Sequence, residues 1–171
     1  AYDPAEAVKR ARTIVRFKSA KYSTENPFLL GGALADAGAE LLENYSAFAL
    51  PLGEAFQLRD DVLGVFGDPS ITGKPAGDDL REGKRTELIA HALAKSAPAE
   101  RDFIQDRLGA SDMSDVEVAK MSTILKSSGA LVETEASISE LTEQSLTALK
   151  RITVPDLSLA GMYYLSEIVT K

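Results

Sequence analysis

Hydrophobic residues recur at intervals of three and four along almost the whole chain, which is the spacing of one face of an α-helix. Ser114 and Asp156 are good N-caps, and Asp3 is another, with Pro4 behind it at the first helical position. No alternating strand pattern of useful length appears, so we expect an all-α fold with about seven or eight helices. The helices are predicted over residues 3–22, 28–35, 39–66, 85–95, 98–108, 114–126, 129–151 and 155–170.

Two stretches interrupt this pattern. Pro51 lies inside the long third segment, where a proline should kink a helix or split it. Residues 67–83 contain four glycines and two prolines, which excludes a continuous helix and predicts a loop of about seventeen residues. Loops of this length without regular structure usually carry function, and we expect this one to be mobile when no ligand holds it.

The composition indicates one globular unit. A chain of 171 residues, 44% of them hydrophobic, can bury roughly 70% of its unfolded surface, and a single domain is expected. Its 26 acidic and 19 basic residues give a net charge of −7, and no basic stripe carries interleaved aromatic residues, so nucleic acid is not expected as a partner. Without a long apolar run or a signal-peptide pattern, we expect a chain that does not span a membrane and is cytoplasmic.

The metal chemistry open to this chain is narrow. It has no cysteine, which excludes disulfides and thiolate zinc sites, and its single histidine, His91, makes a histidine-based metal centre unexpected. We interpret His91 as a packed or half-exposed helix residue. Any metal in this protein should therefore be held by oxygen ligands.

Two adjacent carboxylates, Asp60 and Asp61, lie at the end of the predicted helix 39–66, in the run Phe56-Gln57-Leu58-Arg59-Asp60-Asp61-Val62-Leu63. Helical spacing places Gln57, both acids and Gly64 within one arc of that helix. A helix C-terminus is an unfavourable place for anions, and acids that face a core are costly unless a cation offsets them. Hard divalent cations such as Mg²⁺ suit paired carboxylates, so this run predicts a metal site.

Three lysines complement these acids. Lys74 and Lys84 belong to the predicted loop and its end, and Lys18 lies on the first predicted helix beside Ser19. A diphosphate leaving group develops negative charge as its carbon–oxygen bond breaks, and fixed cations together with Mg²⁺ stabilise that charge. The acids and lysines together therefore predict a site for a metal and a diphosphate.

The chain resembles the C-terminal half of a trans-type isoprenyl diphosphate synthase, a member of the polyprenyl synthetase family. The similarity is strongest in three stretches, Gly53 to Asp68, Thr72 to Leu80 and Gly83 to Thr86, which resemble the second aspartate-rich region of that family and the lysine loop after it. Weaker similarity in helix pattern and length extends over the remainder of the chain. The resemblance implies a helical bundle of the isoprenoid synthase type, of which residues 1–171 would supply only the C-terminal helices of a single domain.

The resemblance also implies a role for each site residue. Asp60 and Asp61 would bind Mg²⁺, or Mn²⁺ in its place, and Gln57 would contact the substrate. Lys18 and Ser19 resemble a lysine–threonine pair of the family, in which the lysine holds diphosphate oxygens and its neighbour steers the carbocation. Lys74 and Lys84 would close over the diphosphate from the loop, and Asp79 would support the metal or orient Lys84 through water. The substrates would be isopentenyl diphosphate and an allylic diphosphate.

Two departures from the family pattern matter. Position 64 is Gly where the second motif of the family often has a third Asp, and Asp68 could replace that acid only if the helix continued past Gly67 and Pro69. We therefore expect the metal to keep more water in its shell. The first aspartate-rich motif of the family, with the isopentenyl diphosphate site and the residues that set product length, has no counterpart in this sequence. Half of an active site should not catalyse condensation by itself.

Two other functions stay open. A non-catalytic helical subunit could bind and tune a complete synthase, although such subunits usually lose the acids and lysines that this chain keeps. A terpene cyclase would share the all-α scaffold and the Mg-diphosphate chemistry, but the Gly73-Lys74-Pro75 loop argues against it. The missing half should also leave apolar side chains uncovered, and we expect association with that half or with a second copy. The side chains expected to be uncovered are Ile14, Phe17, Leu29, Leu30 and Phe56.

Overall fold

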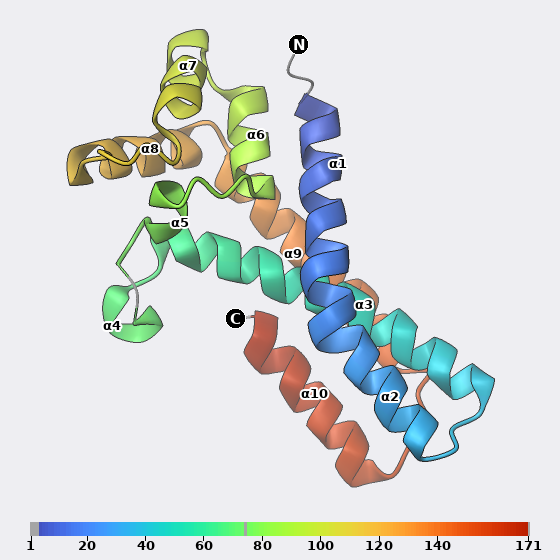
Figure 1. The fold of residues 1–171 in the computed structure, drawn as a ribbon. Helices are drawn as coiled ribbons and strands as arrows, with labels where there is room; N and C mark the ends of the chain where they lie inside the picture. Colours follow the sequence, from blue (N-terminus) through green and yellow to red (C-terminus); the bar gives the residue numbers. More distant parts are fainter. Residues whose placement is uncertain (1–3, 74, 171) are drawn as a thin grey trace. The chain divides into compact units, whose positions relative to one another are not determined.

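The computed structural model describes residues 4–73 and 75–170, and all regular structure in these residues is helical. The helices follow one another along the chain as drawn in Figure 1. Their bounds are α1 Pro4–Ile14, the π-helix η1 Val15–Glu25, α2 Asn26–Leu34, α3 Ala39–Phe66, α4 Pro69–Thr72, α5 Asp78–Arg81, α6 Glu87–Lys95, α7 Pro98–Arg107, α8 Asp115–Ser127, α9 Ala130–Leu149 and α10 Asp156–Thr170. The all-α prediction is therefore confirmed for the described residues.

The predicted helix positions agree with the structure, with three differences. The second part of the first predicted helix is η1, which begins at Val15, continues beyond Tyr22 and ends at Glu25, two residues before Pro27, a residue that has no backbone N–H to donate. The predicted loop contains two short helices, α4 and α5. Pro51 does not split α3, because the neighbouring Phe48 and Leu52 are almost fully buried and their packing outweighs the local cost of a proline.

The chain forms two compact units. One contains the described residues up to Ala11 and residues Asp60–Glu135, and the other contains Arg12–Arg59 and the described residues from Ala136 onward. The long helices α3 and α9 each contribute one part to each unit. The expected single domain stays a prediction.

The core of the first unit lies between α6, α7 and α8, which contact one another in all three pairs. The end of α3 and the short helix α5 add Val65 and Leu80 to this core. Leu80 is only 1% exposed, so part of the predicted loop is packed into the core. The buried members of the cluster are Val65, Leu80, Leu88, Ile89, Ala92, Leu93, Ile104, Met113, Val118, Met121, Ile124, Leu125 and Ala130.

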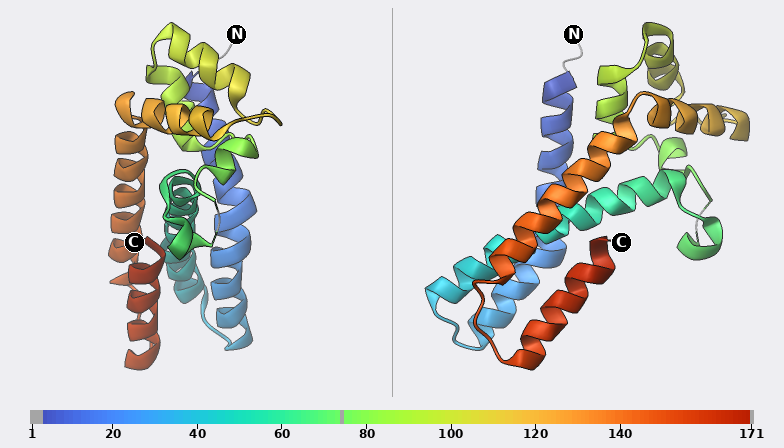
Figure 2. Two further views of the ribbon diagram at one scale, coloured as in Figure 1. Left: turned by 90° about the vertical axis from the view of Figure 1, so that its left-hand side faces the viewer. Right: turned by 180° about the vertical axis from the view of Figure 1, so that it is seen from behind.

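The core of the second unit is formed by α3, α9 and α10, with α2 packed against it. Phe28 of α2 makes an edge-to-face contact with Phe48, with 5.4 Å between the ring centroids. After the turn that follows α9, α10 runs back alongside this core (Figure 2) and buries Met162 in it. The buried members are Phe48, Ala49, Leu52, Ala148, Leu149, Ile152 and Met162.

Close approach between helices in the second unit depends on two glycines. A Cβ added at Gly53 would lie 2.7 Å from the backbone of Ala20, so only glycine lets η1 lie this close to α3. A Cβ at Gly32 would lie 2.7 Å from the side chain of Leu42, whereas Gly31 faces open space. Of the Gly31-Gly32 pair, only Gly32 therefore permits a close approach.

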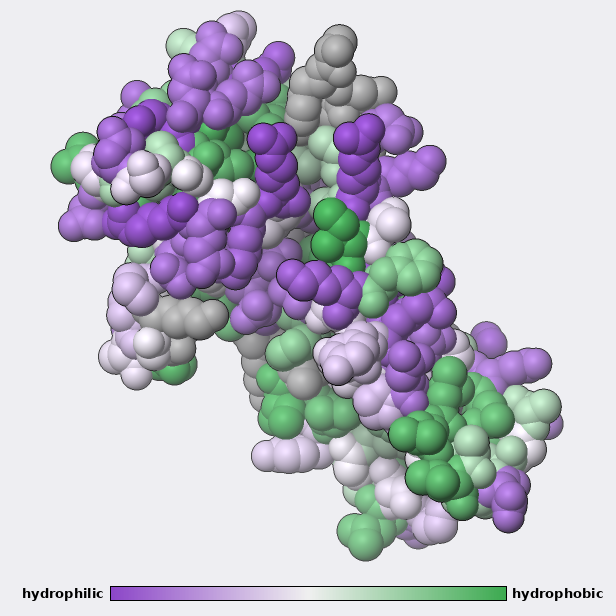
Figure 3. All heavy atoms as spheres, in the orientation of Figure 1, coloured by the Kyte–Doolittle hydropathy of each residue, from purple (hydrophilic) through white to green (hydrophobic). Residues whose placement is uncertain are grey.

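Most of the apolar residues expected to be uncovered are exposed in this chain. Ile14, Phe17, Leu30 and Phe56 are exposed, while Leu29 is half-buried. Figure 3 shows hydrophobic side chains gathered over α2 in the second unit. Association with a second copy or with a further polypeptide stays a prediction.

Candidate functional site

The two adjacent acids at the end of α3 differ in exposure. Asp61 is 5% exposed, whereas Asp60 is exposed to solvent. Neighbouring residues on a helix point about 100° apart, which is why one side chain faces inward and the other outward. The buried Val62 and Val65 fix the inward face of this helix end.

Asp79, a further acid of the predicted site, forms an ion pair with Lys84. Its carboxylate is buried, and Lys84 Nζ lies 2.5 Å from Asp79 Oδ1 and 3.3 Å from Glu82 Oε2. Burial lowers the pKa of Lys84, but the hydrogen bond and charge of Asp79, helped by Glu82, outweigh this effect and raise the pKa above its ordinary value. The ammonium group therefore stays protonated and is held in place before any ligand binds.

The other oxygen of this carboxylate, Asp79 Oδ2, is buried and has no hydrogen-bond partner. It lies against Gly64 of α3, because a Cβ added at Gly64 would overlap the Asp79 carboxylate. Gly64 is one helical turn from both Asp60 and Asp61. The structure thus brings Asp79 and Lys84 together beside the acidic end of α3.

The backbone around Asp79 is anchored to the rest of its unit. Gly77 and Gly83 have positive φ angles of 77° and 71°, which bend the chain into and out of α5. Between them, Leu80 O accepts a hydrogen bond of 3.0 Å from the backbone N–H of Gly109. Arg81 Nη1 donates to Met113 O at 2.6 Å. Asp79 and Lys84 therefore lie on a segment that is fixed at several points.

The first part of the loop is arranged differently. Asp68 caps α4, accepting hydrogen bonds from the backbone N–H of Ser70 at 2.8 Å and from its hydroxyl at 2.7 Å. The hydrogen bonds from the Ser70 hydroxyl and N–H lower the pKa of Asp68. Since α3 ends at Phe66, Asp68 does not continue its acidic face and does not replace the third acid. Lys74 lies outside the described residues.

The remaining predicted residues belong to the second unit. Lys18 is exposed and Ser19 is half-buried, and both lie on η1. The π-helix is rare, and its usual form, a single-turn bulge inside an α-helix, frequently occurs at functional sites. Glu25, near the end of η1, accepts a hydrogen bond from Ser46 of α3, which joins the two helices. Gln57 is half-buried on α3, one turn before Asp60.

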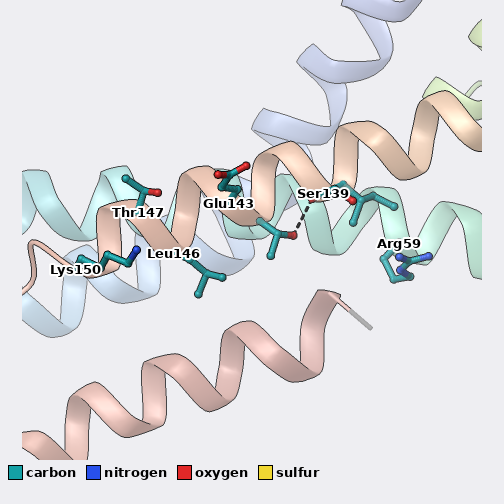
Figure 4. A pocket seen from close by; sticks show the side chains of 8 residues that line it. Arg59, Ser139, Glu143, Leu146, Thr147 and Lys150 are labelled. Atoms are coloured by element: carbon teal, nitrogen blue, oxygen red, sulfur yellow. Dashed lines mark hydrogen bonds between the residues drawn. The ribbon is translucent and has the colours of Figure 1, made fainter.

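The structure also shows a pocket that the sequence did not suggest. It has a volume of about 460 Å³ and lies along α3 and α9, with Arg59 and Lys150 at opposite ends (Figure 4). The position of Arg59 directly before the acidic pair is the one feature of the sequence that could have indicated this pocket. Lys150 comes from a segment with no recognisable motif. The residues that line it are Arg59, Ile138, Ser139, Thr142, Glu143, Leu146, Thr147 and Lys150.

The predicted acids carry the type of ligand atom that binds magnesium. Carboxylate oxygens are the donors that Mg²⁺ prefers, and Asp79 offers a buried oxygen that no protein group satisfies. Among the described residues, however, no three acidic or histidine side chains lie close enough together to hold one ion. The predicted ligands are therefore of the chemical type that binds Mg²⁺. The side chains of Asp60, Asp61 and Asp79 do not, however, converge on one point.

Comparison with known proteins identifies the family. A family model described as polyprenyl synthetase matches residues 2–125, most of the chain. The chain belongs to the polyprenyl synthetase family. This assignment agrees with the resemblance of the aspartate-rich run and the lysine loop. It also identifies the helices as part of the all-α isoprenoid synthase fold.

Three members of the polyprenyl synthetase family are similar over most of this chain. A geranylfarnesyl diphosphate synthase of Aeropyrum pernix is 36% identical over 74% of the chain, and a (2E,6E)-farnesyl diphosphate synthase of Mycobacterium bovis is 32% identical over 82%. The crystal structure of a geranylgeranyl pyrophosphate synthase from Corynebacterium glutamicum, complexed with isoprenyl diphosphate and magnesium, is 40% identical over 96% of the chain, with a TM-score of 0.92. The chain spans 39%, 40% and 46% of the length of these three proteins, respectively.

The helices of the described residues do not meet the requirements of a membrane span. None of them combines the length and the apolar character needed to cross a bilayer.

Proposed function

We propose that this polyprenyl synthetase chain supplies half of the active site of a short-chain prenyl diphosphate synthase. The reaction joins an allylic diphosphate to isopentenyl diphosphate. The allylic carbon–oxygen bond breaks and releases pyrophosphate, a carbon–carbon bond forms to isopentenyl diphosphate, and a proton is lost. The names of the three relatives support this substrate class.

The observation that carries this proposal is the ion pair between Lys84 and the buried Asp79 next to the acidic end of α3. A lysine that only keeps a protein soluble has no need of a buried acid to fix it. A lysine that receives the charge of a leaving diphosphate gains from being fixed in advance, because it need not reorganise during the reaction. The anchored α5 segment provides this preorganisation.

Each site residue has a proposed task. Asp60 and Asp61 hold the metal, and Lys84, with Lys18 and Lys74, donates hydrogen bonds to diphosphate oxygens. When bound, Mg²⁺ neutralises charge on the diphosphate and so makes it a better leaving group.

Two further tasks concern the organic part of the substrates. Gln57 contacts the substrate one turn before the acids. Ser19 orients the cationic carbon through its hydroxyl and carbonyl oxygens, while Asp79 keeps Lys84 in position. Mn²⁺ is expected to replace Mg²⁺, since both accept six oxygen ligands.

A non-catalytic helical subunit is the second candidate, and it is favoured by the exposed apolar side chains of Phe17 and Leu30. Such a subunit would have no use for a preorganised Lys84. The two candidates therefore differ in what mutation of the acids does to prenyl transfer.

A chimera tests the proposal, with this chain replacing the 46% of the Corynebacterium glutamicum enzyme that it matches. We expect incorporation of isopentenyl diphosphate with Mg²⁺ and none with EDTA. Asp60→Ala should lower turnover about 100-fold or more with an unchanged thermal unfolding curve. The matched control is Glu43→Ala, an exposed acid earlier on α3, which should change turnover by less than about two-fold. Normal turnover in a folded Asp60→Ala chimera would refute the catalytic role.

A further inference from the structure

The π-helix η1 is long for its type. It extends over eleven residues, whereas most π-helical structure is a single turn inside an α-helix. At its end, the backbone N–H of Asn26 donates to the carbonyl oxygen of Lys21, five residues earlier, which is the π-type hydrogen bond. Such long runs are rare, so η1 must gain stability from the helices that pack against it.

Three residues of η1 contact α3, and all of them belong to the same compact unit. The contacts are an ion pair of 3.7 Å near the start of η1, a close backbone approach in its middle, and a hydrogen bond at its end. The three pairs are Arg16 with Glu54, Ala20 with Gly53, and Glu25 with Ser46. Along η1 these contacts are four and five residues apart.

The contact residues share one face only because η1 is a π-helix. Arg16 and Glu25 are nine residues apart, which is about 2.5 turns of an α-helix, so an α-helix would place them on opposite sides. A π-helix has about 4.4 residues per turn, so the same nine residues make about two turns. The π-helical form therefore lets Arg16 and Glu25 reach α3 together.

The same geometry turns Lys18 away from α3. Lys18 and Glu25 are seven residues apart, which is about two turns of an α-helix, so an α-helix would place them on one face. In a π-helix seven residues make about 1.6 turns, which directs the two side chains to different sides. The exposures agree with the π-helical form, since Glu25 is 5% exposed and Lys18 is exposed.

Glu25 is a buried acid that is held in its charged form. Burial raises the pKa of Glu25, but the hydrogen bonds from Ser46 and Lys21, with the charges of Lys21 and Arg16, outweigh this effect and keep the pKa below its ordinary value. Lys21 Nζ lies 3.1 Å from Glu25 Oε2. A rotation of η1 that took Glu25 away from Ser46 would deprive a buried oxygen of its donor, which is costly.

We propose that Glu25 is a positioning residue for Lys18. Its hydrogen bond with Ser46 holds η1 in the π-helical form, and that form directs Lys18 away from α3, where a diphosphate can reach it. This inference rests on the proposed function, in which Lys18 donates hydrogen bonds to diphosphate oxygens. Glu25 itself acts only through the direction that it gives to Lys18.

NMR of the metal-free 171-residue chain tests the first step, through the scalar coupling across the hydrogen bond of the Asn26 N–H. We expect coupling to the carbonyl carbon of Lys21 in the wild type. In Glu25→Ala we expect coupling to the carbonyl carbon of Tyr22, four residues earlier, as in an α-helix. Ser46→Ala, which removes the donor without altering η1, should have the same effect. Coupling to Tyr22 in the wild type, or retained coupling to Lys21 in both variants, would overturn the role of Glu25.

A double-mutant cycle in the chimera tests the second step. We expect Glu25→Ala to lower kcat about ten-fold when Lys18 is present, and less than about two-fold in a Lys18→Ala background, because Glu25 acts through that lysine. Glu25→Gln, whose amide oxygen can still accept the Ser46 hydrogen bond, should keep kcat within about three-fold of the wild type. A residue that only stabilises the fold would give equal losses in both backgrounds, and that result would overturn this inference alone.

The matched control is Glu43→Ala, which removes an exposed acid from α3. It should leave the coupling of the Asn26 N–H in place and change kcat by less than about two-fold. A loss as large as that of Glu25→Ala would overturn the assignment to Glu25. Absence of prenyl transfer in the unmutated chimera would overturn the proposed function together with this inference.

Discussion

The two halves of the segment between α3 and α6 each contain two residues of the glycine and proline type, and they differ in packing. In the α4 half, which comprises residues 68–73, residues 68–71 and 73 are exposed, and Ile71 is 84% exposed. Residues 77–84, which form the α5 half, place Leu80 in the core and bury Asp79. Glycine-rich sequence therefore does not by itself mean a mobile loop. The half that carries Asp79 and Lys84 is held by tertiary contacts before a ligand arrives.

The largest expected difference between the halves concerns their apolar residues. Leu80→Ala should lower the free energy of unfolding by about 2–5 kcal/mol, because it removes a side chain that is 1% exposed. Ile71→Ala should change that free energy by less than about 0.5 kcal/mol, because Ile71 is exposed. Urea unfolding of both variants measures the contrast, and equal effects would mean that the α5 half is not anchored.

Two glycines with similar backbone angles sharpen the same contrast. Gly73 and Gly77 have φ angles of 70° and 77°, so alanine is strained at both positions. A Cβ at Gly73 meets nothing within 4 Å, whereas a Cβ at Gly77 would overlap Val118 of α8. We expect Gly73→Ala to cost about 1–2 kcal/mol and Gly77→Ala about 1–3 kcal/mol more. Unfolding experiments that gave both variants the same cost would contradict the close packing of Gly77 on α8.

Low pH should destabilise the α5 half, residues 77–84, through the start of α8. The backbone N–H and hydroxyl of Ser114, followed by Arg107, lower the pKa of Glu117 to about 2. Because the pKa is depressed in the folded state, this carboxylate stabilises the fold fully above about pH 4.5, and the contribution is lost as the pH falls toward 2. Glu117→Gln should remove this part of the pH dependence of Tm. An unchanged acid branch of the curve in that variant would refute the role of Glu117.

Hydrogen exchange should show the smallest energetic difference between the halves. The N–H of Gly109, which donates to Leu80 O, should exchange as slowly as amides of the surrounding core. The N–H groups of Ile71 and Gly73, bonded within α4, should exchange much faster because α4 is a short and exposed helix. Equal protection factors at Gly109 and Gly73 would remove the distinction.

The sequence predicts most of the helices, because apolar spacing and cap residues such as Ser114 are local signals. It does not reveal η1, since a widened turn depends on the packing of α3 against residues such as Ala20. The short helix α5 also escapes prediction. Four residues carry no period, and α5 persists because Leu80 is buried by elements that follow it in the chain.

The candidate site is predictable in its residue types but not in its geometry. The acids and lysines follow from the motif, and the exposure of Asp60 beside the buried Asp61 follows from helix geometry. The approach of Asp79 to Gly64 is a tertiary contact, for which the only sequence signal is a glycine where an acid is expected.

The central claim is that this chain binds a prenyl diphosphate through a divalent cation and Lys84. Isothermal titration of the chain with geranyl diphosphate tests it most directly. We predict binding with Mg²⁺, loss of binding with EDTA, and about ten-fold weaker binding in Lys84→Ala, which removes a charged hydrogen bond. The account would be contradicted if the wild type took up the ligand equally well with EDTA, or took up none with Mg²⁺.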